Sequence, residues 1–124
     1  MVIDDDPALL SFTCKYLARL GYSVVSYRNG EEAWKHFQSP TADYCLAVID
    51  LSMPGLSGEE LSRRMLRSKP AVRLILTSGY PFDTHRLLAA GPDQMAFLHK
   101  PFTPAMLAET VSRLLGAWPR SDAD

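Results

Sequence analysis

The sequence has few cysteines and no long apolar run. It holds 2 cysteines in 124 residues, Cys14 and Cys45, and neither has a second cysteine or a histidine at the spacing of a zinc site. We therefore expect both thiols to stay reduced, which is typical of a cytoplasmic protein. No apolar run approaches the roughly 20 residues of a membrane-spanning helix, so we expect no membrane contact by this domain.

Charge of one sign is also missing. The chain carries 13 Lys and Arg against 14 Asp and Glu, a formal net charge of -1, and the basic residues do not cluster on one predicted face. A protein that binds nucleic acid directly usually has a basic patch, so we expect no direct contact with nucleic acid. At 124 residues, the chain has the length of one domain that buries a core without metal or disulfide support.

Two kinds of segment alternate along the chain. Apolar runs predict strands at residues 1–3, 22–27, 45–50, 72–77 and 95–99. Segments of helical periodicity predict helices at residues 7–20, 30–38, 58–68, 84–91 and 104–116. Strands that alternate with helices imply right-handed crossovers and a parallel sheet. The sequence therefore predicts a three-layer α/β sandwich of five strands and five helices, followed by a polar tail at residues 117–124.

Local signals mark the ends of these helices. Four expected helices follow a residue that accepts hydrogen bonds from a first helical turn: Asp6, Asn29, Ser57 and Thr103. Gly21 is expected to end the first helix, because glycine readily adopts the left-handed conformation found there.

The first expected strand is unusually short, with only three residues before Asp4. A central strand of this length leaves ladder positions of its neighbours unpaired. We expect the chain to be an excerpt of a longer protein, or one that begins late; the alternative is a natural start with a clipped strand.

Polar side chains gather where four of the expected strands end. They are Asp4, Asp5, Asp6, Asp50, Thr77 and Lys100. In open α/β sheets the carboxyl ends of the strands line the ligand-binding crevice. Carboxylates, a hydroxyl and an ammonium at that edge can hold a divalent cation and a phosphoryl group together. This combination predicts a phosphoryl-accepting switch, whereas the plainer alternative is that the first acids only cap a helix.

Four stretches carry a resemblance to a known family. They are residues 2–7 (VIDDDP), 50–58 (DLSMPGLSG), 76–79 (LTSG) and 100–102 (KPF). In order and spacing they resemble the receiver domain of two-component response regulators, over residues 1–116. The resemblance implies a flavodoxin-like fold with a parallel sheet of strand order 2-1-3-4-5.

The resemblance also implies a phosphorylation site that uses a metal. Asp50 would be the phosphoacceptor, with Mg²⁺ as cofactor and Mn²⁺ as a substitute. Asp5, Asp50 and the backbone carbonyl of Ser52 would bind the metal directly, and Asp4 would act through water. Asp6 would lie outside the site, because Pro7 fixes the start of the helix; a slip of this register by one residue is the alternative.

Three further residues receive roles from the resemblance. Lys100 would contact a phosphoryl oxygen, and the peptide bond before Pro101 would be cis. Thr77 would donate its hydroxyl to the phosphoryl group, and Phe97 would turn inward as Thr77 moves. The plainer alternatives are a solvated lysine, a strand threonine and a core aromatic residue.

The partner implied by the resemblance carries a phosphohistidine. It would be a sensor histidine kinase or a histidine phosphotransfer protein. The segment at residues 97–104 also resembles receivers fused to the carboxyl end of hybrid sensor histidine kinases, which would tether the domain to a membrane sensor. A stand-alone regulator is the alternative. The resemblance also puts Ser52 and Gly79 at positions that, in the family, tune hydrolysis of the aspartyl phosphate. These two residues leave the extent of any autophosphatase activity open.

Two rival functions remain at this point. A haloacid-dehalogenase-like phosphatase also uses a strand-end aspartate and magnesium, but it places a second aspartate where this chain has Ser52. A degenerate receiver would bind partners without phosphorylation. We expect the three histidines, which are His36, His85 and His99, to be surface or packing residues, and we expect no activity on small molecules.

Overall fold

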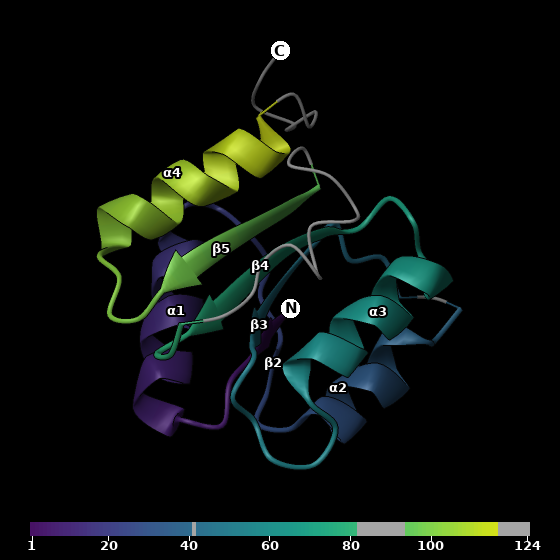
Figure 1. Cartoon of the computed structure of the whole chain (residues 1–124). Coiled ribbons are helices and arrows are strands. Elements are labelled where there is room, and N and C mark those ends of the chain that lie inside the picture. The colour runs from purple at the N-terminus through teal and green to yellow at the C-terminus, as the bar shows by residue number, and fades with distance from the viewer. Residues whose placement is uncertain (41, 82–93, 117–124) are drawn as a thin grey trace.

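A computed structural model describes residues 1–40, 42–81 and 94–116. Five parallel strands form one sheet in the order β2-β1-β3-β4-β5 (Figure 1). The strands are β1 (Val2–Ile3), β2 (Ser26–Tyr27), β3 (Leu46–Asp50), β4 (Arg73–Ser78) and β5 (Met95–His99). This order confirms the flavodoxin-like fold expected from the sequence.

Four helices are described. They are α1 (Pro7–Arg19), α2 (Gly30–Phe37), α3 (Gly58–Ser68) and α4 (Pro104–Leu115). All four expected caps accept hydrogen bonds from the first turns of these helices, and Gly21 follows α1 with a φ of 97°. The expected helix at 84–91, His85 and the expected tail at 117–124 lie outside the described residues.

The helices cover both faces of the sheet, and each face has its own core. Figure 1 shows α1 and α4 on one side and α2 and α3 on the other. In β3, Val48 packs with the first pair and Ile49 with the second. All five residues of β3 are buried, which explains its continuous apolar run, because a central parallel strand has no solvent face.

The second strand is shorter than expected. The prediction covered residues 22–27, but β2 contains only Ser26 and Tyr27, which pair with Val2 and Ile3. The reason is that β2 pairs with β1 alone, and β1 is itself only two residues long. The strand propensity of residues 22–25 could not make up for the missing hydrogen-bond partners on β1.

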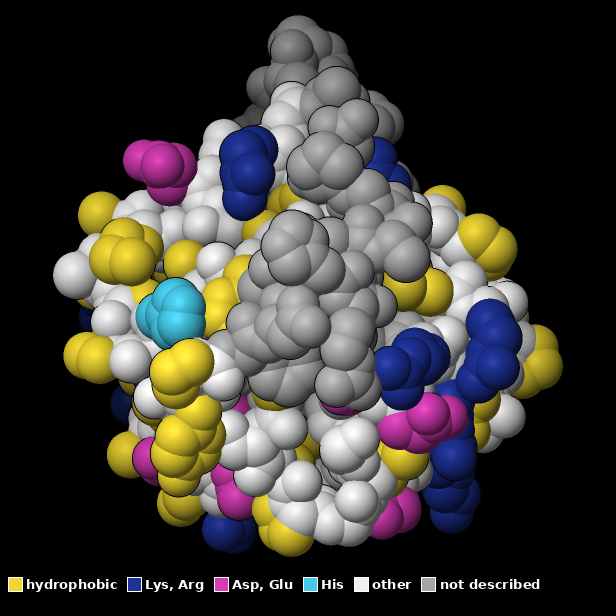
Figure 2. Space-filling model, viewed as in Figure 1, with side chains coloured by type: hydrophobic (Ala, Val, Ile, Leu, Met, Phe, Trp, Pro, Cys, Tyr) yellow, Lys and Arg dark blue, Asp and Glu magenta, His cyan; other side chains and the backbone are white. Residues whose placement is uncertain are grey.

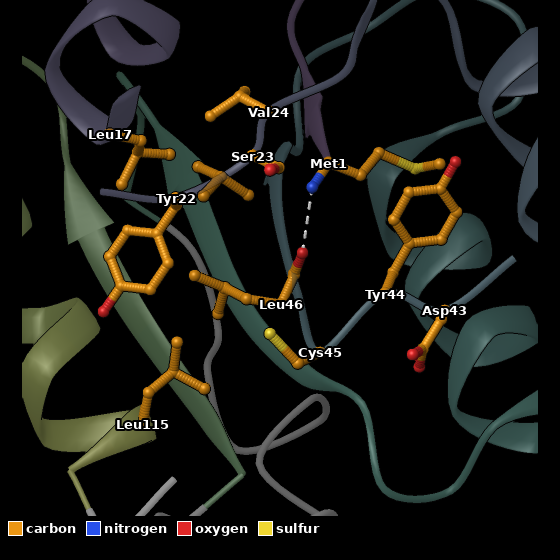
Figure 3. Close-up of a pocket in the computed structure, with 11 residues that line it drawn as sticks. Met1, Leu17, Tyr22, Ser23, Val24, Asp43, Tyr44, Cys45, Leu46 and Leu115 are labelled. Carbon is orange, nitrogen blue, oxygen red and sulfur yellow. Dashed lines mark hydrogen bonds between the residues drawn. The ribbon is translucent and has the colours of Figure 1, made fainter. Parts of the chain in front are cut away.

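A cavity of about 90 Å³ lies beside this shortened strand (Figure 3). Tyr22, Val24, Leu46 and Leu115 are among the residues that line it, and the Met1 amine donates to the Leu46 carbonyl at 3.0 Å. The cavity sits at the amino ends of the strands, so it is remote from the polar groups at their carboxyl ends.

Basic and acidic side chains are mixed over α3 (Figure 2). Three arginines gather there, contrary to the expectation that basic residues do not cluster. However, Arg64 and Arg67 lie 3.2 and 3.7 Å from Glu60 oxygens, and Arg63 pairs with Glu59. The acids balance most of the positive charge of this face.

Among the residues described here, none of the helices is both long enough and apolar enough to span a bilayer. Both cysteines are free thiols and are half-buried.

Candidate functional site

The sheet brings the polar strand ends to one edge. Asp50 ends β3 and pairs in register with Thr77 near the end of β4. Lys100 directly follows β5, and its backbone N–H donates to the Ser78 carbonyl at 2.9 Å. Asp4 follows β1, which pairs with β3 on the other side. Parallel pairing therefore places four separate segments around one point, as the sequence predicted.

Three carboxylates meet at this edge. Asp4, Asp5 and Asp50 each offer an oxygen, and these oxygens lie within 4.8 Å of one another. Asp4 and Asp50 are buried, whereas Asp5 is exposed. Carboxylate oxygens are the ligands that hard divalent cations prefer, and Mg²⁺ is usually held by one or two of them together with water. The donor set therefore fits such an ion, with Asp5 on the solvent side.

Asp6 has a different position from its two neighbours. Its side chain accepts hydrogen bonds from the backbone N–H groups of Ala8 and Leu9 at 3.0 and 3.3 Å. It is thereby committed to the start of α1. Its own N–H donates to Asp4 Oδ1 at 2.9 Å, which orients Asp4. This geometry supports the register that groups Asp4 and Asp5 with Asp50.

Lys100 bridges the two buried acids. Its Nζ lies 3.0 Å from Asp4 Oδ2 and 3.4 Å from Asp50 Oδ2. Burial lowers the pKa of the Lys100 ammonium, but the hydrogen bond and charge of Asp4 and the charge of Asp50 outweigh burial and raise this pKa above its ordinary value. Burial raises the pKa of Asp4, against hydrogen bonds from Asp6 and Lys100, and the charge of Asp50 adds to the rise. The ammonium thus offsets part of the repulsion between the carboxylates.

Lys100→Gln is expected to lower the free energy of unfolding of the metal-free protein by about 1.5–3 kcal/mol, because a charged hydrogen bond is lost. The pKa of Lys100 is raised by folding, so its contribution is complete below the unfolded pKa and disappears as pH rises through the folded pKa. Urea unfolding in EDTA from pH 7 to 11 measures this difference between wild type and variant. A gap that stays constant across the whole range would contradict the assignment.

The Asp50 carboxyl group is fixed on both sides. Only 2% of Asp50 is exposed. Its Oδ1 accepts from the Ser52 N–H at 3.0 Å, and its Oδ2 faces Lys100. The side chain therefore points toward the strand-end edge and not into either apolar core.

The other candidates lie around this centre. Thr77 is 2% exposed and lies directly beside Asp50. Ser52 is an exposed residue of the loop after β3. Phe97 is half-buried, and its ring meets the His99 ring edge-on, with the ring centroids 4.9 Å apart. The Lys100–Pro101 peptide bond is cis, as expected.

The two described histidines behave as packing and surface residues. His36 is exposed and stacks on Tyr27 with ring centroids 5.0 Å apart. His99 is exposed at the end of β5.

Two residues near the site received no role in the sequence analysis. A Cβ on Gly58 would lie 2.3 Å from the Asp50 carbonyl oxygen, so only glycine lets α3 begin directly against the end of β3. Glu31 Oε2 accepts from the Leu56 N–H at 2.8 Å, across 25 residues of sequence. The spacing within the 50–58 stretch was a signal for Gly58, whereas nothing local in the sequence marks Glu31.

Comparison with known proteins gives the family. The model described as the response regulator receiver domain matches residues 1–112. The response regulator GtcR of Aneurinibacillus migulanus is 31% identical over 114 residues, which are 92% of this chain and 45% of GtcR. The sensor kinase CckA of Brucella abortus is 28% identical over 93% of this chain but only 12% of its own length. The chain thus spans a minor part of these two relatives.

Solved structures similar to this chain point to the same family. A CheY-like response regulator receiver domain protein from Methanospirillum hungatei JF-1 superposes with a TM-score of 0.83 at 28% identity, covering 94% of this chain and 91% of that one. The response regulator TrrA from Thermotoga maritima, solved in complex with Mg²⁺-BeF, has a TM-score of 0.77 at 31% identity, covering 92% and 96%. With the sheet order and the three clustered carboxylates, these matches show that the chain belongs to the response regulator receiver domain family of two-component signalling.

Proposed function

We propose that Asp50 accepts a phosphoryl group and that residues 1–116 form the receiver domain that responds to it. The observation that carries this proposal is the position of the Asp50 carboxylate, buried between two further acids and the Lys100 ammonium. A carboxylate can attack phosphorus and form an acyl phosphate. Phosphoryl transfer requires mainly positioning and neutralisation of charge, and this edge of the sheet supplies both.

The donor that fits is a phosphohistidine on a sensor histidine kinase or a histidine phosphotransfer protein. An Asp50 oxygen attacks the phosphorus as the phosphorus–nitrogen bond breaks, and the leaving imidazole nitrogen keeps the electron pair. Lys100 then pairs with a phosphoryl oxygen and Thr77 donates its hydroxyl. Such donors place the domain in the cytoplasm, either as a stand-alone regulator or joined to a sensor kinase.

The metal of this proposal is Mg²⁺, with Mn²⁺ as a substitute. Asp5, Asp50 and the Ser52 carbonyl would bind it directly, with Asp4 acting through water. The clustered oxygens support this assignment, as does the Mg²⁺ complex of TrrA. When bound, the ion neutralises the phosphoryl oxygens and orients them for in-line attack.

Phosphorylation would shift the domain between two conformers. The phosphoryl group adds charge and strong acceptor oxygens, which draw in Thr77 and Lys100. Phe97, half-buried on β5, would turn inward into the space that Thr77 leaves. The surface of β5 and α4 then favours a different partner, as a shift between two existing states.

Acetyl phosphate with Mg²⁺ is expected to add one phosphoryl group to the protein, and EDTA to prevent it. Intact-mass spectrometry under acidic quench measures the adduct, and phosphorylated candidate kinases then test the physiological donor. If wild type with Mg²⁺ gains no adduct from acetyl phosphate or from a phosphorylated kinase, the result would support the degenerate receiver. Turnover of small phosphoesters beyond one equivalent would instead support the phosphatase.

A further inference from the structure

We propose that Glu31 is a positioning residue of the phosphorylation site. It holds the loop of residues 51–57, which joins β3 to α3 and contains Ser52. This inference rests on the proposed function of Asp50 and assigns a residue that controls how the metal site is presented.

The contact between Glu31 and the loop is specific. Glu31 lies in the first turn of α2, and its Oε2 accepts from the Leu56 N–H at 2.8 Å. Gly55 has a φ of 76°, and a Cβ on it would lie 2.7 Å from the same oxygen. The absence of a side chain at Gly55 therefore lets the carboxylate approach the loop.

A second contact supports the first. A Cβ on Gly30 would lie 2.6 Å from the Leu56 carbonyl oxygen, so the start of α2 is in direct contact with the loop. The Leu56 side chain is half-buried against the core and Met53 is buried within it. The far end of the loop is thus held from α2 by a hydrogen bond and by close packing.

The near end of the loop is held by the reacting group itself. Ser52 N–H donates to Asp50 Oδ1 at 3.0 Å, and Leu51 N–H donates to the Thr77 carbonyl at 2.8 Å. Bonding of a phosphoryl group to the Asp50 carboxylate removes charge from it and weakens the first of these contacts. The Glu31 contact takes no part in the reaction, so it keeps the Ser52 carbonyl in place throughout.

The consequence is a population effect on metal binding. Without the Glu31 acceptor, the loop presents the Ser52 carbonyl correctly for a smaller fraction of the time. The apparent affinity for Mg²⁺ falls in proportion to that fraction, while the chemistry of the fully loaded site is unchanged.

The test compares Glu31→Ala with Glu32→Ala. Both residues are acids in the first turn of α2, so both variants lose the same charge near the helix N-terminus, but it is Glu31 that accepts the hydrogen bond from the loop. Calorimetry is expected to show a dissociation constant for Mg²⁺ about threefold to tenfold higher in Glu31→Ala, with the phosphorylation rate at saturating Mg²⁺ close to wild type. Glu31→Gln, which keeps an acceptor oxygen, should restore most of the affinity.

Gly55→Ala gives an independent check. In the wild-type background the new methyl group meets the Glu31 carboxylate, whereas in Glu31→Ala only the backbone strain remains. The two substitutions should therefore weaken Mg²⁺ binding by less together than the product of their separate effects.

Three results would overturn the inference: unchanged Mg²⁺ affinity in Glu31→Ala, an equal loss in Glu32→Ala, or strictly independent effects of Glu31→Ala and Gly55→Ala. Each of these requires a wild type that binds Mg²⁺ and accepts a phosphoryl group. A wild type that does neither rejects the proposed function of Asp50 instead.

Discussion

Replacement of Asp50 by asparagine is expected to abolish phosphorylation of the domain. The amide keeps the shape of the side chain but removes the nucleophilic charge, and it leaves the half-buried Lys100 ammonium paired with the Asp4 carboxylate. We expect no phosphoryl adduct by intact-mass spectrometry after acetyl phosphate or a phosphorylated kinase with Mg²⁺. Circular dichroism of the variant should match wild type, since asparagine fills the same volume.

Asp6→Asn is the matched control. It removes one acidic charge beside the site, but Asp6 caps α1, and asparagine is an equally good cap. Its labelling should therefore equal that of wild type. Full labelling of Asp50→Asn, or loss of labelling in both variants, would contradict the assignment of the acceptor.

Phe37→Ala is expected to lower the free energy of unfolding by more than Lys100→Gln or Phe12→Ala. Phe37 is 0% exposed and lies parallel to the rings of Trp34 and Tyr44, with centroids 6.2 and 5.8 Å away. The Lys69 ammonium lies 4.8 Å from its ring centroid. Truncation of such a side chain costs about 3–5 kcal/mol, a large part of the roughly 5–15 kcal/mol that stabilises a domain. Urea unfolding followed by circular dichroism measures the change.

Phe12→Ala tests whether burial is the cause. Phe12 is 37% exposed, on α1, and its ring lies 6.4 Å from that of Phe102. Because part of its surface already faces water, we expect a loss of about 1 kcal/mol or less. Equal losses in the two variants would show that burial is not the cause of the effect of Phe37→Ala.

The local signals of the chain predicted most of the fold. Asp6, Asn29, Ser57 and Thr103 cap the four described helices as expected, because a cap depends on residues within one turn. The continuous apolar run of β3 predicted a strand buried on both faces. The second strand was predicted too long, because its length depends on the ladder that β1 can offer and not on its own residues.

The candidate site was predicted in its residue types but not in all its contacts. Strand ends that carry Asp4, Asp50 and Lys100 must meet at one edge once the sheet is parallel. The sequence alone left the register of the three consecutive acids open, and the structure separates Asp6 from the other two by its role as a cap.

The sequence by itself determined the type of each described element, the strand edge at which the polar groups gather and the family, because these follow from periodicity, from alternation of strand and helix and from short motifs. Only the tertiary structure decided how Gly58 fits against the end of β3 and how Glu31 reaches Leu56. These contacts join groups on different elements, and their distances depend on how helices and loops pack over the finished sheet, which no local pattern encodes.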